Sequence, residues 1–214
     1  MQMGGLMGGF YKISEWIMRL AYINILWILF SLLGLILFGV WPATAAMFAI
    51  VRKWIMGEHD IPVFKTFWGY YKSDFIRINL LGLSLAIIGY ILYIDIKFLQ
   101  AAVDSWIGAL YLPVLIMTFF YYLMLLYVIP VYVHYDIKLF QVIKNSFLIM
   151  IMNPLANVAL IVSCLMIYFL MISFPGLIIF FGASSLAFVI MWSTQIAFNK
   201  IQKKREAQKE ATEE

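Results

Sequence analysis

Long runs of apolar residues alternate along the chain with short polar segments. Five of these runs reach about 20 residues, the length that an α-helix needs to cross the hydrocarbon core of a bilayer. They cover residues 20–40, 76–94, 106–129, 154–174 and 177–198. The pattern predicts an all-α fold, a polytopic transmembrane helix bundle that occupies residues 1–198 as a single domain. For the charged tail, residues 199–214, we expect a frayed helix or a disordered end.

Three further segments are apolar but too short or too charged to cross the bilayer on their own. Residues 42–56 carry Arg52 and Lys53, and each charge would cost about 2.5–3.5 kcal/mol at the centre of a membrane helix. We therefore expect a re-entrant or interfacial helix there. Residues 10–19, with Lys12, Glu15 and Arg19 at helical spacing, form either an interfacial helix or an extension of the first span. Residues 137–150 are amphipathic, which predicts a helix lying in the membrane interface: Lys138, Gln141, Lys144 and Asn145 share one face, and Leu139, Phe140, Ile143, Phe147 and Met150 the other.

The composition makes a soluble fold untenable. Hydrophobic residues make up 65% of the 214 residues and charged residues 12%, whereas soluble domains average about 45–50% apolar and about 25% charged residues. A chain of this length cannot bury so much apolar surface within itself. The bilayer must therefore act as solvent for the remainder.

The distribution of charge predicts how the chain sits in the cell membrane. Although the net charge is +4, the basic residues flank the apolar runs, so we attribute them to the positive-inside rule and not to nucleic-acid binding. With five spans, twelve Lys and Arg fall on the side that holds the tail, against Lys12, Arg19 and Lys97 on the other. This bias predicts an external N-terminus and a cytoplasmic C-terminus.

Candidate chemical groups are sparse. The single cysteine and the two histidines form no metal-ligand spacing, and no ionisable residue lies centrally in a span, which argues against a proton-driven pump. We predict neither an enzyme nor a cofactor or metal site. His134 and Asp136 suggest a polar cluster at the membrane surface. The amides of Asn24, Asn79, Asn157 and Gln195 suggest hydrogen bonds between helices, or, if they converge, a polar path.

Three stretches, taken in order, resemble the YesL family of bacterial membrane proteins. The first is FGVWPATAAM at 38–47, which contains the family's glycine–x–x–proline–alanine–threonine signature. The second is FKTFWGYYKSDF at 64–75, where Asp74 replaces a more usual asparagine. The third is IKNSF at 143–147, followed by Asn153 and Pro154, where Ser146 replaces a usual alanine. The resemblance covers nearly the whole chain.

Members of that family are often encoded beside binding-protein-dependent sugar importers, in Gram-positive bacteria especially. The resemblance therefore implies a non-enzymatic accessory subunit of an ATP-driven oligosaccharide importer, an ABC transporter whose permease subunits are the partners. The alternative is an independent small-molecule transporter or an oligomeric channel built from several copies. For the accessory role we expect partner contacts at Trp41, Pro42, Thr44, Phe67, Trp68, Lys72, Phe75, Lys144 and Asn145.

Overall fold

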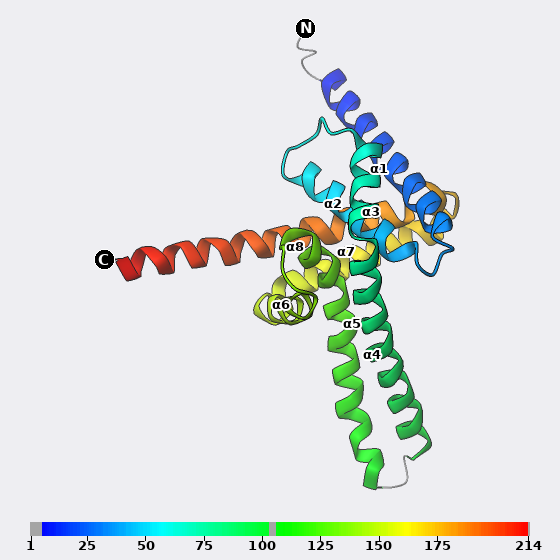
Figure 1. Cartoon of the computed structure of the whole chain (residues 1–214), viewed down its shortest axis with the longest axis vertical. Helices are drawn as coiled ribbons and strands as arrows, with labels where there is room; N and C mark the ends of the chain where they lie inside the picture. The colour runs from blue at the N-terminus through cyan, green and yellow to red at the C-terminus, as the bar shows by residue number, and fades with distance from the viewer. Residues whose placement is uncertain (1–5, 103–105, 214) are drawn as a thin grey trace.

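The computed structural model describes residues 6–102 and 106–213, and over these ranges the chain is built from helices without a strand (Figure 1). In chain order the elements are α1 Leu6–Leu33, α2 Val40–Ile55, α3 Val63–Ser73, α4 Phe75–Ala101, the 3₁₀ helix η1 Trp106–Leu110, α5 Tyr111–His134, α6 Leu139–Met152, α7 Pro154–Ser173 and α8 Gly176–Glu213. Five segments are long and apolar enough to cross a membrane: Gly9–Leu33, Phe75–Ala101, Ile107–His134, Pro154–Ser173 and Gly176–Lys203. The predicted all-α membrane fold is confirmed.

The chain reverses sharply between α1 and α2. The first helix ends at Leu33 instead of continuing to residue 40 as the sequence predicted. Leu35 and Ile36 adopt left-handed backbone angles, with φ of 56° and 63°, which end a right-handed helix. Gly34 and Gly39 approach so closely that a Cβ atom on either would overlap backbone of the other or of Ser31. The glycine of the family signature is therefore required by this turn.

After the turn, α2 runs back along α1. The Trp27 Nε1 atom donates a hydrogen bond to Thr44 Oγ1 at 3.0 Å, and near the other end the rings of Trp16 and Trp54 meet edge to face with centroids 6.0 Å apart. Pro42 lies in the first turn of α2, where a proline costs no helical hydrogen bond. Thr44 and Pro42 thus belong to the same antiparallel helix pair.

The short helix α2 forms the centre of the molecule. It contacts α1, α3, α4, α5 and α8, and most of its side chains, from Pro42 to Trp54, are buried. The expected alternatives were a re-entrant or an interfacial helix; enclosure by five other elements is compatible with a place at membrane depth, where a short helix is tolerated when protein surrounds it.

Helices α1 and α8 are joined by a buried side chain. The Asn24 Nδ2 atom donates to the Ile179 carbonyl at 2.7 Å, and Asn24 Oδ1 accepts from the backbone N–H groups of Ala183 and Ser184 at 3.0 and 2.9 Å. Trp16, two turns earlier in α1, packs on Phe188, further along α8. The two helices therefore run in opposite directions where they touch, and beyond this contact the N-terminal end of α1 and the C-terminal end of α8 diverge (Figure 1).

The remaining long helices form two hairpins. Helices α4 and α5 run side by side away from the centre, and α7 and α8 run crosswise to them (Figure 1). We predicted that the third span would end at Pro130, but α5 continues through this proline to His134. Packing explains the difference, because every residue from Tyr127 to Tyr132 is buried, and tertiary contacts can sustain a helix across a proline.

Helix α6 packs on the bundle along one side. Its buried residues are Val142, Ser146, Ile149 and Met150, which follow one face against α5 and α7. Phe140 and Phe147, which the sequence places on the apolar face of an interfacial helix, are exposed on the protein surface, whereas Met150 of the same predicted face is buried. The small Ser146 is fully buried and donates to the Val142 carbonyl, which lets α6 pack closely.

Candidate partner-binding surface

A cluster of aromatic side chains joins α3 to the end of α1. The ring of Phe30 lies 5.0 Å from those of Phe67 and Tyr71 and 5.5 Å from that of Trp68. The Tyr71 hydroxyl donates to the Phe30 carbonyl at 3.1 Å, and its ring continues the contact to Phe75. Phe67 and Tyr71 are buried, whereas Trp68 is 42% exposed. The cluster thus has a fixed inner side and an outer side available to a partner.

Next to this cluster is an apolar groove of about 550 Å³ between the α1–α2 turn and α4. We call it the signature groove, because Trp41, which lies within the glycine–x–x–proline–alanine–threonine stretch, is part of its lining. It is lined by Leu37, Phe38, Trp41, Phe75, Ile76, Asn79, Leu80, Leu83 and Ala86. The Asn79 Nδ2 atom donates to the carbonyls of Phe38 and Phe75 at 2.9 and 2.8 Å. Since this amide is already engaged, the groove offers mainly apolar surface.

The structure separates the nine sequence-predicted contact residues into three groups. Trp41 and Phe75 line the signature groove, and Trp68 and Lys72 are exposed on the neighbouring helix α3. Pro42 and Phe67 are buried and Thr44 is half-buried, so these three support the surface from within. Lys144 and Asn145 lie on α6, which packs on α5 and α7 and belongs to another part of the molecule.

A polar cluster lies at the junction of α3, α4 and α5. Arg77 forms an ion pair with Asp136 at 3.4 Å, donates to the Ile137 carbonyl, and places its guanidinium 5.6 Å from the ring centre of Tyr132. Burial raises the pKa of Asp74, and the nearby Arg77 partly opposes that increase. Sequence reasoning identified Asp136 but missed Arg77, because their pairing spans 59 residues.

His134 contributes to the same end of the molecule from the last turn of α5. Its Nδ1 atom accepts a hydrogen bond from Arg52 Nε at 3.2 Å, and its ring packs against Phe198 of α8 with centroids 4.4 Å apart. Arg52, whose charge argued against a membrane-spanning α2, thus binds the last turn of α5. Within residues 6–102 and 106–213, no three His, Cys, Asp or Glu side chains come together as metal ligands.

The other helix amides bind neighbouring backbone or side chains. Asn157 accepts from the Tyr127 hydroxyl at 2.6 Å and donates to the Met150 carbonyl at 2.9 Å, which links α5, α6 and α7. Asn24 links α1 to α8, as described above. Gln195 donates to Asn199 within α8. Asn24 and Asn157 therefore make the interhelical hydrogen bonds expected of them.

Comparison with known proteins identifies relatives over nearly the full chain. The family described as "Protein of unknown function, DUF624" matches residues 20–96. The chain is 40% identical to uncharacterized protein YteU of Bacillus subtilis (strain 168) over 89% of its own length and 86% of the relative. It is 35% identical to YesV, over 89% and 91%, and 33% identical to YesL, over 95% and 96%, both from the same organism. No solved structure matches the chain.

Proposed function

Because the chain belongs to the YesL-like family of helical membrane proteins, we propose that it is an accessory subunit of an ATP-driven oligosaccharide importer. In this role it binds the importer's permease subunits and catalyses no reaction of its own. The observation that carries the proposal is the signature groove, where Trp41 and Phe75, from two separate family stretches, line one apolar surface. Such a groove suits an apolar helix of a partner protein.

The surroundings of the groove also support a partner. Exposed Leu80 and Leu83 continue its floor along α4, and exposed Trp68 lies nearby on α3. Aromatic residues such as Trp68 are enriched at the centres of protein interfaces. Lys72, also exposed on α3, adds a charge that can select among partners at the rim. Helix α7 buries only Leu160 and Met171, so the chain has ample lateral surface for assembly within a membrane.

We further propose that the protein resides in the cell membrane with its basic C-terminal tail in the cytoplasm. Counting five crossings places the N-terminus outside, whereas antiparallel packing of α1 and α8 supports both termini on the cytoplasmic side. The second arrangement uses α2 as a short additional crossing. Its 16 residues span about 24 Å, less than the hydrocarbon core, but the surrounding helices shield its ends.

The charge distribution supports the arrangement with both termini inside. In this arrangement three connections between helices lie outside the cell. They contain no Lys or Arg and cover residues 34–39, 102–110 and 174–175. Arg52, Lys53 and Lys138 flank the connections on the side of the termini. Lys12 then joins the basic tail in the cytoplasm, in keeping with the positive-inside rule.

Co-purification from the native membrane tests the accessory role. The tagged full-length protein is extracted in mild detergent, and we expect permease subunits of a sugar importer in stoichiometric amounts. The variant L80W fills the signature groove and should reduce their recovery at least tenfold. The control I91W, three turns further along the same face of α4 and also exposed, should leave recovery unchanged. Recovery of the wild-type protein alone, as a stable oligomer, would favour the independent channel or transporter.

A further inference from the structure

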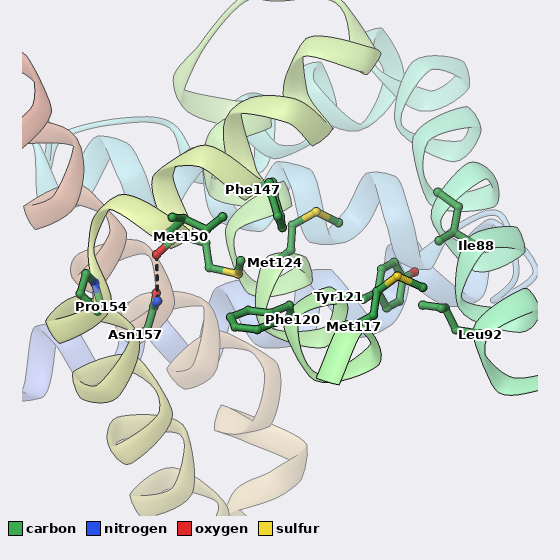
Figure 2. A pocket seen from close by; sticks show the side chains of 11 residues that line it. Ile88, Leu92, Met117, Phe120, Tyr121, Met124, Phe147, Met150, Pro154 and Asn157 are labelled. Carbon is green, nitrogen blue, oxygen red and sulfur yellow. Dashed lines mark hydrogen bonds between the residues drawn. The ribbon is translucent and has the colours of Figure 1, made fainter. Parts of the chain in front are cut away.

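A second apolar groove lies where α4 and α5 meet α6 and α7, and we call it the methionine groove (Figure 2). Its volume is about 570 Å³, within the range of about 300–1,000 Å³ typical of small-molecule sites. The lining residues are Ile88, Leu92, Met117, Phe120, Tyr121, Met124, Phe147, Met150, Ile151, Pro154 and Asn157. None of them belongs to the signature groove.

The few polar groups of the methionine groove are already bound within the protein. Asn157 donates to the Met150 carbonyl and accepts from Tyr127, and the first of these bonds is visible at the groove's end in Figure 2. The Tyr121 hydroxyl donates to the Leu85 carbonyl at 2.6 Å. A ligand that needs hydrogen bonds therefore gains little affinity here. An alkyl chain forms no hydrogen bonds and leaves none unsatisfied.

The remaining lining matches a flexible hydrocarbon chain. Met117, Met124 and Met150 contribute unbranched side chains that adapt to an irregular occupant. Helices α4, α5 and α7 each carry a segment apolar enough to cross a membrane, so a groove between them is within reach of lipid acyl chains when these segments cross the bilayer.

Helix α6 carries a lysine, Lys144, next to this groove. Lys144 is exposed and lies three residues before Phe147 and seven before Ile151, a spacing that puts all three on one helix face. Phe147 and Ile151 line the groove, so this helical spacing places Lys144 next to it, one turn before Phe147. No carboxylate of the described residues forms an ion pair with Lys144. Its charge remains available to an anion next to the apolar groove.

We propose that the methionine groove binds one acyl chain of an anionic phospholipid whose phosphate contacts Lys144. Basic residues next to grooves between transmembrane helices are suited to anionic lipid headgroups. The cation distinguishes this occupant from an apolar helix of another protein, which would bring no anion to the rim. This lipid site is separate from the signature groove and does not depend on the importer role.

Lipid counting by native mass spectrometry tests the headgroup contact. The full-length protein is purified with phosphatidylglycerol and phosphatidylcholine of identical acyl chains, and the lipids retained per folded protein are measured. We expect the phosphatidylglycerol to be preferred. K144Q should lower its apparent affinity about fivefold, and the control K65Q, which removes an exposed lysine of α3, should not. A full preference in K144Q would overturn the proposal.

Groove-filling variants test the acyl chain. M117W and I88W introduce a large ring from either wall at side chains that are already exposed, so the fold should tolerate at least one of them. Each should reduce retention of both lipids at least threefold, whereas I116W, at an exposed site outside the groove, should not. Inorganic phosphate alone should not compete with the lipid. Unchanged lipid retention together with loss of co-purified permease would overturn the proposal in favour of a protein occupant.

Discussion

The indole ring of Trp41 in α2 lies directly against the backbone of Gly82 in α4. A Cβ atom at Gly82 would overlap three ring atoms of Trp41, so the close approach of these two helices requires a glycine. The same ring lines the signature groove. Packing of the core and the shape of the proposed docking surface therefore depend on one contact.

We expect the substitution G82A to destabilise the protein by about 1–3 kcal/mol, because an extra methyl group in a tight contact forces the ring and backbone apart. Thermal unfolding in detergent measures the effect. G69A is the matched control, since a Cβ there meets open space; it should stabilise α3 by up to about 1 kcal/mol. Equal losses in both variants would mean that the contact with Trp41 is not what requires glycine.

Removing the side-chain amide of Asn24 should weaken the junction of α1 and α8. N24A leaves the Ile179 carbonyl and the N–H groups of Ala183 and Ser184 without this side-chain partner, and we expect a loss of about 1–2 kcal/mol. N199A removes an exposed asparagine from the second half of α8 and should change the unfolding temperature little. A stable N24A protein would show that water or a rearranged helix replaces the amide.

Stability should depend on pH through Asp74. Burial raises the pKa of this carboxyl in the folded protein, so folding favours the protonated form. The contribution of Asp74 to the free energy of unfolding is therefore fully present below its pKa in the unfolded chain. It is lost as the pH rises through its pKa in the folded protein. D74N, which restores the residue more usual in the family, should therefore raise the unfolding temperature at pH 7 and lessen the difference from pH 4.

A second substitution shows whether the pH dependence of the unfolding temperature comes from Asp74 or from the neighbouring carboxyl group of Asp136. Asp136 is almost fully exposed and pairs with Arg77, so D136N should not raise stability at pH 7. A gain from D136N equal to that from D74N would point to a general charge effect of the cluster instead of the burial of Asp74.

Epitope tags at the two ends of the chain test the membrane arrangement. If both termini are cytoplasmic, protease should remove both tags from inside-out vesicles and neither from sealed right-side-out vesicles. Removal of the N-terminal tag from right-side-out vesicles alone would instead support the five-crossing arrangement deduced from charge counting.

The sequence was most informative where the apolar runs are long. Their length and composition identify five membrane helices without knowledge of any contact, because the bilayer imposes the same requirement on each. Boundaries were less accurate where tertiary packing decides them. The reversal after Leu33 depends on two glycines that meet across a turn, and α5 passes Pro130 because the neighbouring side chains are buried.

The candidate sites show the same limit. Trp41 and Phe75 were proposed as contact residues from family stretches, and the fold brings them to one groove. Pro42 and Phe67 came from the same stretches, but burial gives them internal roles. The methionine groove escaped notice because its lining comes from four helices and consists of ordinary apolar residues, which a single sequence cannot distinguish from general membrane-facing surface.

The bonds between Asn24 and α8 also order events during synthesis. The ribosome makes α1 first and α8 last, so the Asn24 amide lacks its final partners until translation of the chain is almost complete. A chain that stops before residue 179 carries an unsatisfied amide into the membrane. Since α2 also contacts α8, the packing around the central helix is completed only after α8 has been made.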